Sequence, residues 1–165
     1  MKNFLKHLLV IGFLICFSTM ANAAVTPNSI VTPQTPNRGI VQFLQGTDAA
    51  GTYKTVYTAG ANGSKIVGLS VNNNDASATH LVTCQVVNTT VKYGGVSLTT
   101  VASSGFVSGT NAQSLLSSTL FPGGFTDANG NYGLILASGD TLQCTFATAL
   151  TASDVINIIA TVMDY

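Results

Sequence analysis

The chain has 165 residues, of which 46% are hydrophobic and only 7% charged, and its six positive and six negative side chains cancel to a formal net charge of zero. This sparse charge excludes the dense Lys and Arg surface on which nucleic-acid binding depends. The high hydrophobicity excludes a disordered chain, which combines few apolar residues with high net charge. Thr, Ser and Asn supply most of the polarity beside 16 glycines, a composition typical of strands and tight turns.

The first residues have the pattern of a secretory signal peptide. Lys2 and Lys6 lead to an apolar run at residues 8–17, about the ten residues expected of a signal's hydrophobic region. Residues 21–23, Ala-Asn-Ala, match the small-x-small motif that signal peptidase reads. A membrane anchor would need an apolar run of about 20 residues. We therefore predict a signal peptide at residues 1–23 and an exported bacterial protein, secreted, periplasmic or on the cell surface, with no transmembrane segment after processing.

Residues 24–37 carry three of the four prolines, each preceded by threonine. Proline restricts its own backbone and pushes the residue before it toward extended geometry. We predict an extended Thr/Pro arm outside the core. The same pattern also fits a disordered tail or an arm that reaches a neighbouring subunit.

After Arg38 the chain becomes a series of short runs of alternating apolar residues with turn residues between them. Asn62-Gly63 and Gly94-Gly95 have the chemistry of hairpin turns. The last run is apolar at nearly every position, which is typical of a strand covered on both sides. The predicted strands are residues 40–45, 52–59, 65–72, 79–88, 88–93, 96–102, 140–149 and 155–163.

This spacing predicts an all-β fold, a single antiparallel β-sandwich or jelly-roll-like domain of about 8–9 strands at residues 38–165. Only residues 112–118 could form a turn or two of helix. Residues 103–131 are either a long loop, which would often be functional, or contain a further strand.

Two cysteines, Cys84 and Cys144, remain after processing, and both lie on the apolar face of an alternating strand. Export places them in an oxidising compartment, so we predict one buried disulfide. Two separate core thiols are the alternative. A metal site would need ligands that this sequence does not cluster with them.

The sequence shows no assembled catalytic chemistry. His80, the one histidine of the processed chain, lies on an apolar strand face and is best explained as a strand-end or hydrogen-bonded core residue. No nucleophile-elbow motif occurs, and without glutamate any paired-carboxylate site would depend on dispersed aspartates. Residues 127–131 resemble the start of a calcium loop but lack its later ligands, so a hairpin turn is the better interpretation. We predict a protein that is not an enzyme, with no catalytic residues, cofactor or metal.

Tyr53 and Tyr57 are four residues apart on one predicted strand and therefore share a face. Exposed tyrosines on a β-face can bind carbohydrate, so both are candidate ligand contacts. Burial within the sandwich is the alternative.

Two segments, residues 55–66 and 136–142, together with the Asp164-Tyr165 terminus, resemble small virion structural proteins of tailed bacteriophages. The resemblance covers residues 37–165 loosely. It implies a compact β-sandwich with a structural role on a particle surface and carries over no catalytic residues. The signal peptide and the disulfide depart from that group, whose members assemble in the cytoplasm.

These observations lead to one main hypothesis and one alternative. The main hypothesis is a non-enzymatic, exported structural or interaction subunit that associates with protein partners or with itself on a surface or particle. The alternative is a secreted binding module for glycans or another surface ligand.

Overall fold

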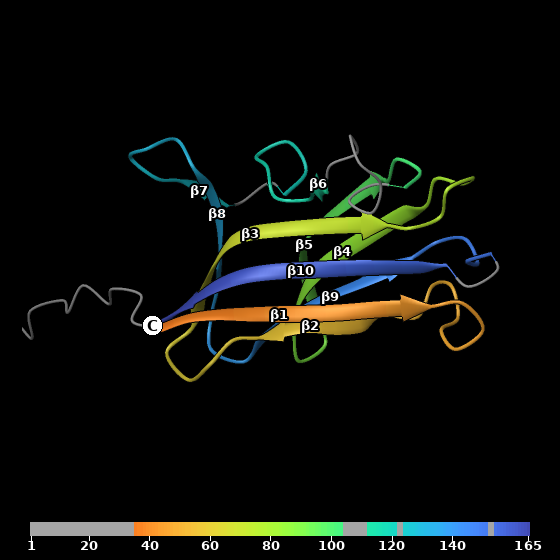
Figure 1. Cartoon of the computed structure of the whole chain (residues 1–165). Helices are drawn as coiled ribbons and strands as arrows, with labels where there is room; N and C mark the ends of the chain where they lie inside the picture. Colours follow the sequence, from red (N-terminus) through yellow and green to blue (C-terminus); the bar gives the residue numbers. More distant parts are fainter. Residues whose placement is uncertain (1–34, 104–111, 122–123, 152–153) are drawn as a thin grey trace, which may run out of the picture. The chain divides into compact units, whose positions relative to one another are not determined.

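The computed structural model describes residues 35–103, 112–121, 124–151 and 154–165. The predicted signal peptide and residues 24–34 of the predicted arm lie outside this part of the chain. Within it, the regular elements are ten strands and no helix. They form two antiparallel sheets that pack as a sandwich (Figure 1), which confirms the predicted fold class.

The first sheet, called sheet I, is built on three long strands. β10 is central and pairs with β1 on one side and β3 on the other, while the short strands β8 and β6 pair with the far edge of β3 and β7 extends β8. Its strands are β1 (Thr35–Leu44), β3 (Ser64–Asn73), β6 (Gln113–Ser114), β7 (Phe125–Thr126), β8 (Tyr132–Leu136) and β10 (Val155–Asp164).

The second sheet, sheet II, has the order β2-β9-β4-β5. β4 and β9 are its central pair, and Cys84 stands directly opposite Cys144 in their register. Its strands are β2 (Lys54–Thr58), β4 (Leu81–Asn88), β5 (Val91–Thr99) and β9 (Asp140–Phe146).

The core lies between the sheets because alternate residues of each long strand face inward. Phe43 of β1 contacts Phe146 of β9, with ring centroids 5.2 Å apart. The predicted Cys84–Cys144 disulfide is confirmed and is fully buried within this core.

β1 and β2 belong to different sheets but run close together at one corner of the sandwich (Figure 1). Gly39 makes this approach possible, since a Cβ at this position would collide with the carbonyl oxygen of Val56. β1 begins at Thr35, so the last three residues of the predicted arm are part of a strand.

Both predicted hairpin turns are wrong. β2 and β3, on either side of Asn62-Gly63, belong to different sheets. β5 runs through Gly94-Gly95 without interruption, and Gly94 is the extra residue of a bulge with φ of 64°. Glycine adopts positive φ in a bulge as readily as in a turn, so its presence alone does not distinguish the two. The turn between β4 and β5 lies at residues 89–90 instead.

The predicted hairpin turn at Asn129-Gly130 is confirmed, since Gly130 N–H donates to the Asp127 carbonyl at 2.9 Å between β7 and β8. The described parts of residues 103–131 contain the short strands β6 and β7, and residues 112–118 form no helix. The prediction that β10 is covered on both sides is wrong within this chain, because the outward-facing residues of β10 stay partly exposed. The described residues contain no helix that is long and apolar enough to cross a membrane.

Removal of the disulfide should destabilise the protein strongly. The bridge closes a loop with a sequence separation of 60, and in the chain-entropy model such a loop contributes about 4 kcal/mol. We expect the Cys84→Ala, Cys144→Ala double variant to lose about that much free energy of unfolding in urea titrations. An unchanged urea midpoint, with the wild-type disulfide verified by mass, would contradict this.

Candidate functional site

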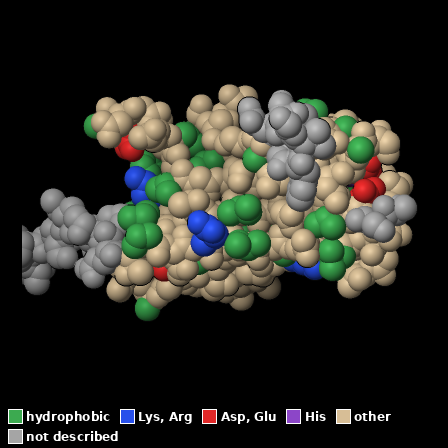
Figure 2. Space-filling model, viewed as in Figure 1, with side chains coloured by type: hydrophobic (Ala, Val, Ile, Leu, Met, Phe, Trp, Pro, Cys, Tyr) green, Lys and Arg blue, Asp and Glu red, His purple; other side chains and the backbone are tan. Residues whose placement is uncertain are grey.

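The outer surface of sheet I, called the apolar face, exposes hydrophobic side chains in separate patches with polar residues between them (Figure 2). Ile40 and Ile135 are 60% and 55% exposed, large values for residues within strands. On β1, β3, β8 and β10, the only charged side chains that point outward are the basic Arg38 and Lys65. Its hydrophobic members are Pro36, Ile40, Leu44, Val67, Ile135, Val155, Ile159 and Met163.

Side chains occupy part of the outer edge of sheet I. Asp48 accepts a hydrogen bond from the Leu44 N–H at 2.7 Å, and Lys54 Nζ donates to the Gln42 carbonyl at 2.9 Å. The Asp48 carboxylate and the Lys54 ammonium are 2.6 Å apart. Burial would raise the pKa of Asp48, but the hydrogen bonds from Lys54 and Leu44 outweigh it and lower the pKa. This pair covers backbone groups of β1 that could otherwise bind another strand, a use of lysine common at sheet edges.

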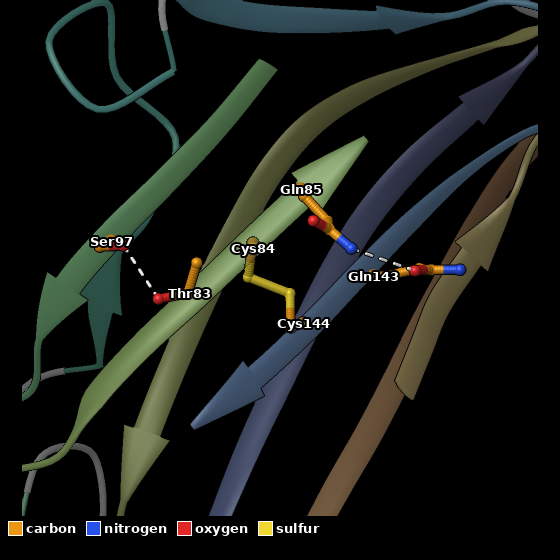
Figure 3. Close-up of a disulfide and its surroundings, with 6 residues drawn as sticks. All are labelled: Thr83, Cys84, Gln85, Ser97, Gln143 and Cys144. Atoms are coloured by element: carbon orange, nitrogen blue, oxygen red, sulfur yellow. Dashed lines mark hydrogen bonds between the residues drawn. A yellow bond between two sulfur atoms is a disulfide. The ribbon is translucent and has the colours of Figure 1, made fainter. Parts of the chain in front are cut away.

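The outer surface of sheet II, called the polar face, is lined by hydroxyl and amide side chains (Figure 3). Thr83 and Ser97 are joined by a hydrogen bond of 2.9 Å between their hydroxyls. Gln85 donates from its amide to the Gln143 amide oxygen at 3.3 Å. These residues alternate with the inward-facing cysteines, so the disulfide lies directly beneath them.

A shallow hollow of about 330 Å³ opens on the polar face. Gly95 stands directly opposite Gln85 in the register of β4 and β5. Because opposed residues share a face, the missing side chain of Gly95 leaves space between the Thr83–Ser97 pair and Lys92. The residues that line the hollow are Thr83, Cys84, Gln85, Lys92, Gly94, Gly95, Val96 and Ser97.

The structure does not bring Tyr53 and Tyr57 together on one surface. Tyr53 precedes β2 and is 36% exposed, and Lys92 Nζ lies 5.5 Å from its ring centroid. A bulge between Thr55 and Tyr57 interrupts the alternation of β2, and the Tyr57 hydroxyl donates to Asp164 of sheet I at 2.5 Å. Of the two tyrosines, Tyr53 is the one that contacts Lys92 of sheet II.

Tyr57 belongs to a polar cluster that connects the two sheets. Asp164 also accepts hydrogen bonds from the Ser64 hydroxyl at 2.7 Å and the Asn37 amide at 3.1 Å. Burial and the hydrogen bond to Asp164 raise the pKa of Tyr57, while its hydroxyl and that of Ser64 lower the pKa of Asp164. The cluster stabilises an ionised Asp164, whose carboxylate accepts all three of these hydrogen bonds from residues of the same chain.

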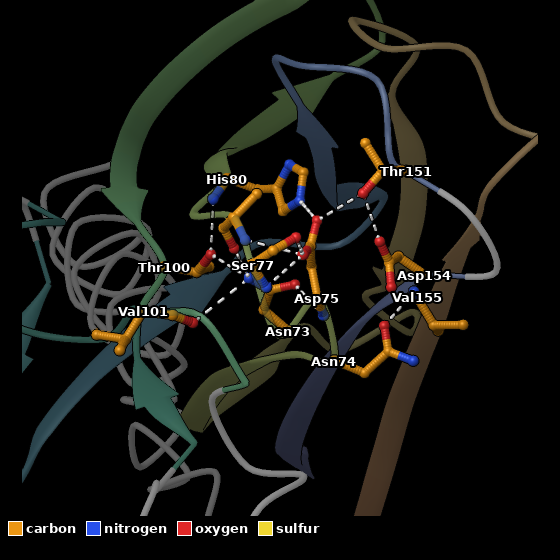
Figure 4. Close-up of polar contacts among 11 residues, drawn as sticks. Asn73, Asn74, Asp75, Ser77, His80, Thr100, Val101, Thr151, Asp154 and Val155 are labelled. Atoms are coloured by element: carbon orange, nitrogen blue, oxygen red, sulfur yellow. Dashed lines mark hydrogen bonds and ion pairs between the residues drawn. The ribbon is translucent and has the colours of Figure 1, made fainter.

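A second polar cluster surrounds His80 and Asp75, which are 2% and 1% exposed (Figure 4). His80 Nε2 lies 3.0 Å from one Asp75 oxygen, and Thr151 Oγ1 lies 3.1 Å from the same oxygen. The other oxygen accepts from Ser77 and Ala78 N–H groups, each at 2.8 Å. His80 is the hydrogen-bonded core residue that the sequence predicts.

This second cluster has a His–Asp contact like that of a catalytic triad, but no nucleophile among the described residues contacts the histidine. His80 Nδ1 has no hydrogen-bond partner among the described residues, and the burial of the ring keeps it from any substrate in solution. Nor do the described residues bring together three or more His, Cys, Asp or Glu side chains that could hold a metal ion.

No protein-family model matches the chain, and no curated protein matches it either. Among solved structures, the chain is similar to the capsid asymmetric unit of cyanophage Pam1. The identity is 18% and the TM-score 0.36, with 79% of this chain and 84% of that chain covered. A likeness at this level establishes no common function.

The residues of the two faces carry no motif that marks them as functional in the sequence. The alternation of Thr83 and Gln85 with Cys84 was a usable sign of an uncharged outer surface. By contrast, Lys92 and Tyr53 are brought together from opposite edges of sheet II, and no sequence spacing indicates that contact.

Acid should weaken the Asp75 cluster. Burial would raise the pKa of Asp75, but the hydrogen bonds from His80, Ser77 and Ala78 outweigh it and hold the pKa well below its ordinary 3.8. A lowered folded-state pKa gives stability that is complete above the unfolded-state pKa and is lost as the pH falls through the folded-state value. We expect the free energy of unfolding to fall steadily as the pH is lowered below about 4.

The Asp75→Asn variant tests the cause of that loss. It should be less stable than wild type at pH 7 by roughly 2–4 kcal/mol, because a neutral amide replaces an acceptor of several buried hydrogen bonds. Its stability should also depend less on acid pH. Urea titrations at pH 7, 4 and 2.5 measure both effects, and equal pH slopes for the two proteins would contradict the assignment.

Loss of the Asp48–Lys54 pair should expose the edge of β1. We expect the Asp48→Ala, Lys54→Ala variant to aggregate faster than wild type in thioflavin T and light-scattering assays, because the Gln42 carbonyl and Leu44 N–H become available. Its free energy of unfolding should change by no more than about 1 kcal/mol. Lys92→Ala, which removes an exposed lysine from sheet II, is the control and should behave as wild type. Equal aggregation of all three proteins would disprove the protective role.

Proposed function

We propose that this chain is an exported, non-enzymatic assembly subunit that packs against copies of itself on a cell surface or particle. The observation that carries the proposal is the apolar face. Several exposed hydrophobic side chains on one surface commonly mark a site of protein contact, and here the polar pairs Arg38–Thr161 and Gln42–Asn157 lie between them. The sequence resemblance to small virion structural proteins agrees with such a role.

The composition of β10 supports a covered outer surface. Its inward residues, such as Ile156 and Ile158, are fully buried, whereas outward Ile159 remains partly exposed. Three of the five outward residues of β10, Val155, Ile159 and Met163, are apolar, and apolar residues on both faces of a strand are typical of a sheet covered on both faces. In this chain the second cover is missing, and another subunit would supply it.

A second copy is the occupant that best fits the dimensions and charge of this face. Three strands of ten residues present roughly 500 Å² per copy, or about 1,000 Å² for a pair, near the lower limit for a specific interface. A contact of this size is weak alone but effective when it is repeated across many linked copies. The net charge of −2 for residues 24–165 creates little repulsion between copies.

Export has support from two independent features. The amino-terminal segment has the charge, length and cleavage motif of a signal peptide. The buried Cys84–Cys144 bridge is of a kind that persists in oxidising compartments and is rare in the cytosol.

A single substitution on the apolar face should prevent self-association. We expect the processed wild-type protein to associate with rising concentration in analytical ultracentrifugation, and Ile40→Lys to weaken that association at least tenfold, because a lysine must be desolvated in the contact. Val91→Lys is the matched control, since Val91 is 64% exposed on a strand of sheet II. It should associate as wild type does.

Two results would overturn the proposal. One is a wild-type protein that stays monomeric up to about 1 mM, the weakest affinity that dense assembly would need. The other is a protein found only in soluble periplasm or medium when producing cells are fractionated and probed on a non-reducing gel. Sedimentation with envelopes or particles is the expected result.

A further inference from the structure

The hollow on the polar face is walled by groups that hydrogen-bond to hydroxyls. Thr83 and Ser97 contribute hydroxyls, and Gln85, a residue that is 9% exposed, contributes an amide. The bond from Gln85 to Gln143 uses one N–H and one carbonyl oxygen lone pair, and each amide can make further hydrogen bonds. The lining contains no carboxylate and a single cation, Lys92.

An aromatic ring lies next to these polar groups. Lys92 lines the hollow, and its ammonium lies 5.5 Å from the ring centroid of Tyr53. Tyr53 does not itself line the hollow, but it contacts a residue that does, and it is 36% exposed. An apolar ring beside a few directed polar groups is the usual composition of a small-molecule site.

We propose that the hollow and Tyr53 together bind a neutral oligosaccharide. A pyranose ring has a C–H surface that can stack on tyrosine and hydroxyls that can bond to Gln85, Thr83 and Ser97. A polyanion would require more than one cation, and an apolar ligand would leave the hydroxyls and amides unpaired. This site is on sheet II and is independent of the assembly contact on sheet I.

Gly95 is the residue that keeps the site open, and it offers a sharp test. It has no positive φ, and a Cβ there would meet its nearest neighbour, the Cys84 carbonyl, at 3.4 Å. Gly95→Val should therefore fold while its side chain fills the hollow. Gly68→Val is the matched control, since Gly68 is in β3 of sheet I and its Cβ would meet Thr161 at 3.5 Å.

The experiment titrates the isotope-labelled processed protein with cellohexaose, maltohexaose and chitohexaose and follows backbone amide signals by NMR. Wild type should bind at least one of them with saturable shifts confined to residues 83–97, 53 and 143. Tyr53→Ala should weaken that binding at least fivefold, Gly95→Val should abolish it, and Gly68→Val should leave it unchanged. Circular dichroism and an intact disulfide verify the fold of each variant.

Three outcomes would overturn the assignment. The first is that none of the three sugars causes shifts at about 10 mM, roughly the weakest binding expected of a shallow site. The second is that binding survives Gly95→Val. The third is that only a sulfated oligosaccharide binds and that salt abolishes this binding. The last would indicate a charge contact through Lys92. None of these outcomes bears on the self-association of sheet I, which ultracentrifugation tests separately.

Discussion

The register between β4 and β9, held by Cys84 and Cys144, determines what both sides of sheet II present. The two cysteines stand opposite each other and point into the core. In a strand, a shift of one residue would move every side chain to the other face. The bridge therefore excludes the register in which Thr83, Gln85 and Gln143 would face the core and Val82 and Val86 would face outward. The same covalent link that stabilises the core keeps the polar face polar.

The two outer faces of the sandwich consequently have different chemistry. Sheet II presents hydroxyls and amides above the disulfide, whereas sheet I presents isoleucine, valine and leucine with two basic residues. A domain with equivalent faces would orient at random in an assembly. This one can bury sheet I against a second copy and leave sheet II in solvent, where a ligand can reach it.

Much of the fold follows from the sequence, and several of the errors come from three bulges. Alternation predicted the strands around Cys84 and Cys144 and their disulfide. Each bulge adds one residue, at Val56, Val67 or Gly94, and reverses the expected orientation beyond it. For this reason Val67 is exposed although Leu69 is buried, and Tyr57 turns toward the other sheet while Tyr53 does not. The sites were harder to predict, because their members meet only through tertiary contacts, as Lys92 meets Tyr53.

The way the edge of β1 is covered favours assembly through faces over strand addition. Another strand could pair with β1 only after displacing Asp48 and Lys54 from its backbone groups. Gly39 brings β2 against the same corner and restricts access further. Strand addition propagates without limit and leads to aggregates, whereas a face contact is limited by the shape of the two surfaces. A protein that blocks its long edge but leaves hydrophobic residues on the adjoining face directs association to the surface that can specify a geometry.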